Sequence, residues 1–135
     1  MQVYKKILVT ADCSPVDNAI LRHVSALARQ NQAAVYLLHV VHSHTLDQER
    51  TLREQAQACL ESYRAALQAE GVEAHVLIRS GEPDTEILDE IATKDYDLVA
   101  MATHGHTFLG DLLFGSVSRS LKHKISIPLL LLKSE

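Results

Sequence analysis

The sequence predicts an α/β protein built on a doubly wound, five-stranded parallel sheet in the order 3-2-1-4-5, with helices on both faces. Strand-like and helix-like patterns alternate along the whole chain, which favours parallel strands joined by right-handed crossovers. Trp is absent and aromatic residues make up only 4%, so the core must be aliphatic. No linker, low-complexity segment or repeat interrupts the pattern, and we expect a single domain over residues 1–135.

The first part of the chain shows a strand, a helix and a second strand. Ile7–Val9 is a short apolar run, and Ser14 before Pro15 is typical of an N-cap followed by proline at the first helical position. The helix is predicted to run to about Gln30. Its apolar positions follow at helical spacing: Val16, Ile20, Val24 and Leu27. Ala34–Val41 is largely apolar and contains three β-branched valines, which indicates a strand covered on both faces.

The middle of the chain shows a long amphipathic helix, a strand and a shorter helix. The stripe of the long helix consists of Leu52, Ala56, Cys59, Leu60, Tyr63 and Leu67. Gly71 is expected to end this helix in the left-handed conformation. Val72–Ser80 alternates between apolar and polar residues, which favours a strand near the edge of the sheet. A turn at Gly81–Pro83 leads into a helix that carries Ile87, Leu88, Ile91 and Ala92.

The last part of the chain begins and ends with strands. Leu98–Met101 is a buried strand, Val117 and Leu121 mark a helix, and Ile127–Leu132 is a final strand. This final strand is unusually apolar for one at a sheet edge, where unpaired backbone groups favour association. Antiparallel pairing with a second copy would cover it and give an isologous homodimer. A helix packed over it within the monomer is the alternative.

The segment from Ala102 to Ser116 carries the strongest functional signal. It leaves a buried strand at Gly105 and enters a helix at Gly115 and Ser116. Glycine lets a backbone approach a ligand, and a helix start offers unpaired N–H groups with partial positive charge. With the Ser116 hydroxyl as a further donor, this pattern predicts an anion site, most simply a phosphate cradle. A plain strand-to-helix connection is the alternative.

A second loop, Thr10–Ser14, has the position of a ligand-binding loop. In doubly wound sheets, ligands bind beyond the carboxyl ends of the central strands, where the strand order reverses. The Asp12 carboxylate would there contact a ribose or a Mg²⁺ ion carried by a nucleotide. An Asx turn or a helix cap is the alternative role for Asp12.

The loop and several other segments resemble the universal stress protein family. Its signature, Gly-x2-Gly-x9-Gly-Ser/Thr, is matched by Gly105, nine intervening residues, Gly115 and Ser116, whereas Ala102 replaces the first glycine. The first strand and its Asp-x-Ser turn are similar to Ile7–Ser14. Three further segments are similar to family landmarks: Leu37–Val41, Gly81–Pro83 and Ile127–Leu130.

The resemblance implies a homodimeric regulatory protein of the stress response that binds ATP or AMP, with Mg²⁺ carried by the nucleotide. It places Gly105, Gly115 and Ser116 at the phosphates, and Asp12 and Val40 at the nucleoside. The remaining expected site residues are Thr10, Ala102, His104 and Val117. Its signalling partner is not indicated by the sequence.

Two other functions stay open on the sequence alone. One is a non-nucleotide interaction module of the same fold, which Ala102 favours. The other is a slow ATPase, although no arginine finger or water-positioning residue is evident. No Gly-x-Ser-x-Gly motif is present and no base is assignable to Ser14 or Ser116, so an enzyme is not predicted.

Charge and cysteine usage narrow the class of protein. The formal net charge of −4 argues against a general nucleic-acid binder. Neither a signal-peptide pattern nor an apolar stretch of about 20 residues is present, so we expect a cytoplasmic protein with reduced thiols. Cys59 lies on an apolar stripe and is interpreted as a core residue. The remaining candidates, His39, His42, His44, His104 and His106, are interpreted as solvated loop histidines rather than metal ligands.

Overall fold

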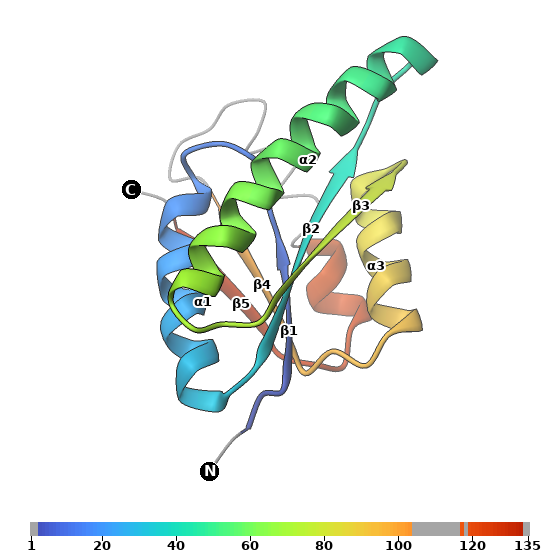
Figure 1. Cartoon of the computed structure of the whole chain (residues 1–135). Coiled ribbons are helices and arrows are strands. Elements are labelled where there is room, and N and C mark those ends of the chain that lie inside the picture. Colours follow the sequence, from blue (N-terminus) through green and yellow to red (C-terminus); the bar gives the residue numbers. More distant parts are fainter. Residues whose placement is uncertain (1–2, 104–116, 118, 134–135) are drawn as a thin grey trace.

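A computed structural model describes residues 3–103, 117 and 119–133. All strand pairs are parallel, and the five strands form one sheet in the order β3-β2-β1-β4-β5, which confirms the predicted fold (Figure 1). The strands are β1 Lys6–Thr10, β2 Ala34–Val41, β3 Ala74–Ser80, β4 Leu98–Thr103 and β5 Leu129–Lys133. The helices with defined bounds are α1 Asp17–Asn31, α2 Leu46–Ala69 and α3 Pro83–Thr93, and residues 119–124 are also helical.

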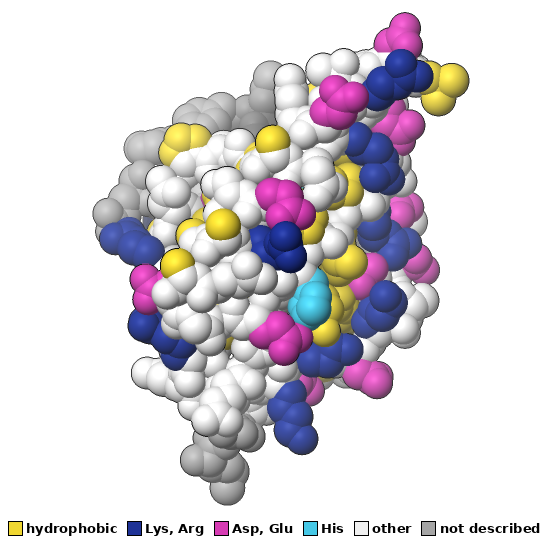
Figure 2. Space-filling view, viewed as in Figure 1, with side chains coloured by type: hydrophobic (Ala, Val, Ile, Leu, Met, Phe, Trp, Pro, Cys, Tyr) yellow, Lys and Arg dark blue, Asp and Glu magenta, His cyan; other side chains and the backbone are white. Residues whose placement is uncertain are grey.

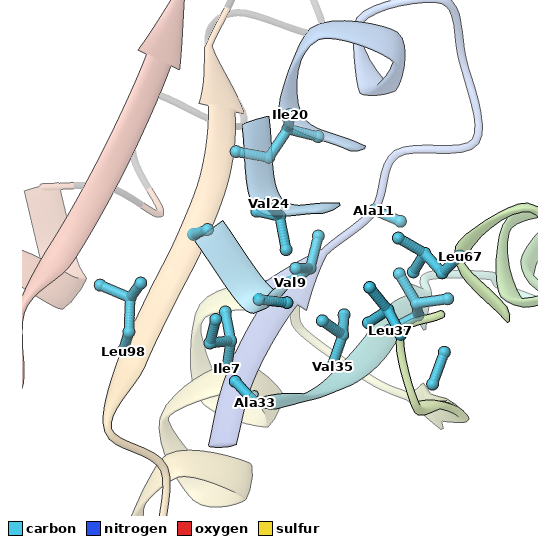
Figure 3. Packing of buried hydrophobic residues seen from close by; sticks show 14 of the residues in the cluster. Ile7, Val9, Ala11, Ile20, Val24, Ala33, Val35, Leu37, Leu67 and Leu98 are labelled. Atoms are coloured by element: carbon cyan, nitrogen blue, oxygen red, sulfur yellow. The ribbon is translucent and has the colours of Figure 1, made fainter. Parts of the chain in front are cut away.

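Each face of the sheet has its own hydrophobic core because side chains alternate along the strands. The first core lies under α1 and α2; Figure 3 shows Ile20 and Val24 of α1 beside Val9 of β1. The second core lies under α3 and the helical residues 119–124. Its fully or nearly fully buried members are Leu8, Leu38, Ile87, Tyr96, Val99, Met101, Val117 and Leu121. The predicted helices on both faces are therefore present.

The start of α1 differs from the sequence prediction. The helix begins at Asp17, and its N-cap position, Val16, makes no side-chain capping bond. Ser14 is not the cap, because its hydroxyl donates instead to Asp12 Oδ2 at 2.7 Å. The carbonyl of Ser14 accepts from the Asp17 amide at 3.0 Å, so a turn precedes the helix.

The long helix α2 also starts earlier than its apolar stripe. It begins at Leu46 rather than near Leu52, and Thr45 caps it by accepting from the Gln48 amide at 3.1 Å. The first turns extend past the end of the sheet in Figure 1, and Leu46 is 83% exposed. These turns pack on no core, so they carry no apolar stripe. Gly71 follows the helix with φ of +83°, as predicted.

The two outer strands are β3 and β5, which confirms both predicted edge positions. The final strand begins at Leu129 rather than at Ile127. Leu131 in its centre is 43% exposed, whereas the neighbouring Leu130 and Leu132 pack against the first core. The side chain exposed at the centre of β5 is therefore apolar.

The expectation of reduced thiols is wrong for this structure, since a disulfide joins Cys13 to Cys59. The two Cα atoms are 6.1 Å apart although 46 residues separate the cysteines in sequence. The physical reason is tertiary: α2 packs beside the loop that follows β1, a proximity that sequence spacing does not reveal. Cys59 packs against the first core, as its place on the stripe predicted.

Candidate functional site

The strand order reverses between β1 and β4, and the candidate site lies at the carboxyl ends of the strands there. A cavity of about 50 Å³ opens at this point. It is lined by Thr10, Ala11, Asp12, Leu38, His39, Val40, Pro83, Ile87 and Val117. Four of the residues predicted from the sequence, which are Thr10, Asp12, Val40 and Val117, therefore surround one cavity.

Thr10 gives this cavity a polar wall. The residue is 5% exposed, and its Oγ1 has no hydrogen-bond partner among the residues that the structure describes. A buried hydroxyl without a partner costs free energy on the order of 1–3 kcal/mol. A ligand atom in the cavity would recover this cost, which makes the Thr10 hydroxyl a natural contact.

The loop between β1 and α1 is organised by Asp17. Its carboxylate accepts from the backbone amides of Asp12 at 3.0 Å and Cys13 at 2.7 Å, and from the Tyr63 hydroxyl at 2.7 Å. Burial raises the pKa of Asp17 above 3.8, while these three donors oppose the rise. No sequence pattern indicated a role for Asp17 or Tyr63 at this site, because each acts through contacts that only the fold creates.

Asp12 presents its carboxylate at the cavity. Oδ2 accepts from Ser14, and Oδ1 has no partner in the described part of the chain. One oxygen is therefore available to accept from a ligand hydroxyl or to contact a cation. The Ser14 contact joins two side chains and is therefore not the Asx turn considered as the alternative role for Asp12, which would use the Ser14 backbone amide. It leaves the second oxygen of Asp12 available to a ligand.

His39 is a site residue that sequence reasoning misassigned to a solvated loop. It belongs to β2, is half-buried, and its Nδ1 lies 2.8 Å from the Ala11 carbonyl oxygen. Since a carbonyl only accepts, Nδ1 carries the hydrogen in this contact. His39 thus connects the end of β2 to the loop after β1. Its position at the carboxyl end of a buried strand was the available signal.

The other histidines near this end of the sheet lie at the surface. His42 is exposed and its Nδ1 is 3.3 Å from the Gly81 carbonyl oxygen and 3.7 Å from Glu82 Oε1. His44 is close enough to His42 for an edge-on ring contact. Within residues 3–103 and the described part of 117–133, no three His, Cys, Asp or Glu side chains are grouped as a metal site.

Ala102 stands apart from the other candidates. It is 4% exposed and its methyl group packs in the first core, on the face of the sheet covered by α1. The cavity borders the other core through Leu38, Ile87 and Val117. The structure does not place Ala102 among the lining residues. His104, Gly105, Gly115 and Ser116 lie outside the described residues.

Three hollows along other elements are larger than this cavity, and two of them exceed about 300 Å³. One of about 470 Å³ lies at the carboxyl ends of β2 and β3, next to the start of α2, and one of about 370 Å³ lies between α1 and α2. Ligand pockets commonly hold about 300–1,000 Å³, so the 50 Å³ cavity accommodates only part of a nucleotide-sized ligand. We still place the candidate site at the 50 Å³ cavity. This cavity lies where the strand order reverses, and it combines the unpartnered Thr10 hydroxyl with a free oxygen of the Asp12 carboxylate.

Surface charge and hydropathy add two observations. On the face shown in Figure 2, acidic and basic side chains are interspersed rather than gathered by sign. None of the helices in the described ranges is long and apolar enough to cross a membrane.

Comparison with known proteins extends these observations. The model of the universal stress protein family matches residues 3–133. Universal stress protein MJ0531 of Methanocaldococcus jannaschii is 30% identical over 142 residues, which cover 97% of this chain and 83% of that protein. The solved structure of MJ0577, from the same organism, superimposes with a TM-score of 0.85 at 29% identity and covers 98% of both chains. The Archaeoglobus fulgidus universal stress protein in complex with dAMP has a TM-score of 0.72 at 25% identity and covers 96% of this chain and 98% of that one.

Proposed function

The chain belongs to the universal stress protein family, and from this premise we propose that it is a homodimeric regulatory protein of the stress response that binds ATP or AMP at the carboxyl ends of β1, β2 and β4. The cavity at the switch point is the observation that carries the proposal. It brings together the unpartnered Thr10 hydroxyl, the free Asp12 oxygen and apolar side chains. The related protein from Archaeoglobus fulgidus was solved with a nucleotide, dAMP.

The chemistry of the lining residues suits the two halves of a nucleoside. Val40 and Ile87 offer apolar surface on which a base would pack. Asp12 offers a carboxylate oxygen to the ribose hydroxyls, and Thr10 offers a hydroxyl that both donates and accepts. We assign the phosphates to Gly105, Gly115 and Ser116 by their match to the family signature, with Mg²⁺ carried by the nucleotide.

Bound nucleotide would act by changing the dimer or its choice of partner. The loop after β1 supplies Asp12 to the site and also leads into α1, so a ligand that orders this loop alters a surface element. Such a protein needs no catalytic group. A slow ATPase has no specific observation in its favour among the described residues.

A thermal-shift measurement tests the proposal. ATP or AMP at millimolar concentration should raise the melting temperature, because a ligand that binds only the folded state stabilises it by about 2.7 kcal/mol at a hundredfold excess over Kd. Gly115→Val should abolish the shift, since a branched side chain blocks the approach of backbone N–H groups to phosphate. The control is Ala65→Val on the exposed side of α2, which should keep the shift. Absence of a shift with every adenine nucleotide would contradict the proposal.

A further inference from the structure

The loop after β1 and the first residue of α1 are each attached to α2. Cys13 forms the disulfide with Cys59, and Asp17 accepts a hydrogen bond from Tyr63 at 2.7 Å. Cys59 and Tyr63 are four residues apart and therefore lie on the same side of α2, one turn from each other. One attachment is covalent and reversible by thiol chemistry, whereas the other is a hydrogen bond. Both hold the segment that carries Asp12.

Cys13 occupies an unusual backbone conformation next to the candidate site. It directly follows Asp12, which lines the cavity, and its φ is +61°. The left-handed region costs a residue with a Cβ roughly 1–2 kcal/mol, so Cys13 adopts it only where surrounding contacts enforce it. The contacts are the disulfide to Cys59 and the hydrogen bond from the Cys13 amide to Asp17.

The crosslink is not needed to supply a core. Small domains rely on disulfides when they bury too little apolar surface, but this chain has a hydrophobic core on each face of its sheet. Both cysteines are only partly buried, and thiol–disulfide exchange requires that an attacking thiolate reach one of the two sulfur atoms. A crosslink that the core does not require, placed beside a ligand site, suits a regulatory role.

We propose that the Cys13–Cys59 disulfide is a reversible thiol–disulfide exchange site that couples oxidation to nucleotide affinity, the oxidised form binding more tightly. The inference rests on the proposed function. With the disulfide formed, the loop is held in the conformation that presents Asp12 at the cavity. After reduction the hydrogen bonds to Asp17 and the contacts of Ala11 with β2 remain. Without the crosslink, Cys13 relaxes from its left-handed conformation and the Asp12 carboxylate moves.

The exchange partner is a dithiol in one direction and a low-molecular-weight disulfide in the other. One thiolate of the dithiol attacks a sulfur of the protein disulfide; the S–S bond breaks, and the departing sulfur leaves as a thiolate that takes up a proton. The second thiol of the reductant then displaces the other cysteine and closes its own disulfide. Two electrons and two protons pass to the protein, which then holds two thiols. Oxidation reverses these steps.

Nucleotide titrations of three forms of the full chain test the coupling. The forms are the oxidised protein, the protein reduced with dithiothreitol, and the double variant Cys13→Ser/Cys59→Ser. The oxidised form should bind AMP at least about fivefold more tightly than the reduced form. A fivefold change in affinity is the lower end of the range that is typical when two sites are coupled. The double variant should match the reduced protein and should not respond to dithiothreitol. Equal affinities in the two redox states, or tighter binding by the reduced form, would overturn the inference.

Amide hydrogen exchange separates this inference from the proposed function. The Asp12 and Cys13 amides both donate to Asp17, so they should exchange slowly in the oxidised protein and faster after reduction, with or without nucleotide. Unchanged exchange would overturn the inference even if AMP binds. Faster exchange with no AMP binding in either state would instead contradict the proposed function. Tyr63→Phe serves as the control that removes the hydrogen bond and keeps the disulfide.

Discussion

At the scale of single residues, Ala102 decides how the family signature should be understood in this chain. It stands where the signature has its first glycine, and a methyl group there favoured a protein without a nucleotide. The methyl group, however, packs in the first core beneath α1, while the cavity borders the opposite face of the sheet. The substitution therefore fills a core position rather than narrowing the cavity.

We predict that Ala102→Gly leaves nucleotide affinity unchanged and lowers stability by about 1–2 kcal/mol, from the lost methyl burial and the greater backbone entropy of glycine in the unfolded chain. Calorimetric titration and urea denaturation measure the two effects. Ala100→Gly is the matched control, because Ala100 is fully buried on the same face of the same strand. A marked gain in affinity for Ala102→Gly alone would show that the methyl group obstructs the ligand.

At the scale of elements, an ionic cluster fastens α3 to β3. Arg79 of β3 donates to Glu86 and Glu90 at 2.9 Å each, and it also pairs with Asp89. Glu90 is 3% exposed and accepts a further hydrogen bond from the Tyr96 hydroxyl at 2.6 Å. Because α3 begins beside the candidate site with Pro83 and Ile87, this cluster holds one wall of the cavity in place.

Tyr96 should make the stability of the protein sensitive to alkaline pH. Burial, and then the hydrogen bond to Glu90, raise the pKa of Tyr96 above its usual 10.0. A group whose pKa is raised on folding binds its proton more tightly in the folded state, so its contribution is complete below pH 10.0 and declines as the pH rises further. Denaturant unfolding at a series of pH values should therefore show stability falling above that pH.

In Tyr96→Phe this decline should be shallower, although not absent, because the Tyr63 pKa is also raised by burial and by Asp17. At neutral pH the variant should lose about 1–3 kcal/mol, since Glu90 then lacks one of its donors. An alkaline slope equal to that of the natural protein would contradict this account of Tyr96.

Sequence patterns were most informative for elements whose burial is set locally. The limits of β2 agree with the prediction because this strand lies between β3 and β1 in the sheet, and His39 alone interrupts its apolar run. Likewise, the Thr10–Ser14 loop was expected at the site because ligands of doubly wound sheets bind beyond the carboxyl ends of the central strands. Val40 was expected there only from the family resemblance. Contacts made across the fold could not be predicted in this way: the Cys13–Cys59 disulfide depends on how α2 packs beside the loop after β1.

At the scale of the whole molecule, the open edge at β5 is the feature that suggests a second copy. Leu131 exposes 43% of its surface on an edge strand, and no other strand of the described residues pairs with the outer side of β5. Antiparallel pairing of the β5 strands of two copies would bury the Leu131 side chains and pair the backbone groups of the edge. The result would be a symmetric dimer.

We predict that the protein sediments as a dimer and that the Leu131→Asp variant sediments as a folded monomer. A carboxylate at the centre of β5 would be buried, and would therefore lower stability, only when a second copy pairs with the strand. Analytical ultracentrifugation over a range of concentrations makes the measurement. Leu46→Asp is the control, since Leu46 is exposed at the far tip of α2 and should leave the dimer intact. A monomeric natural protein, or a dimeric Leu131→Asp variant, would refute the β5 interface.

The central claim is that an adenine nucleotide binds at the carboxyl ends of β1, β2 and β4. The most direct test is an NMR titration of ¹⁵N-labelled protein with AMP. We predict saturable shifts of the amide signals of Thr10, Asp12 and Val40. The signals of Arg22 and Arg29, in the hollow between α1 and α2, should stay in place. An absence of shifts at millimolar AMP, or shifts confined to that hollow, would contradict the claim.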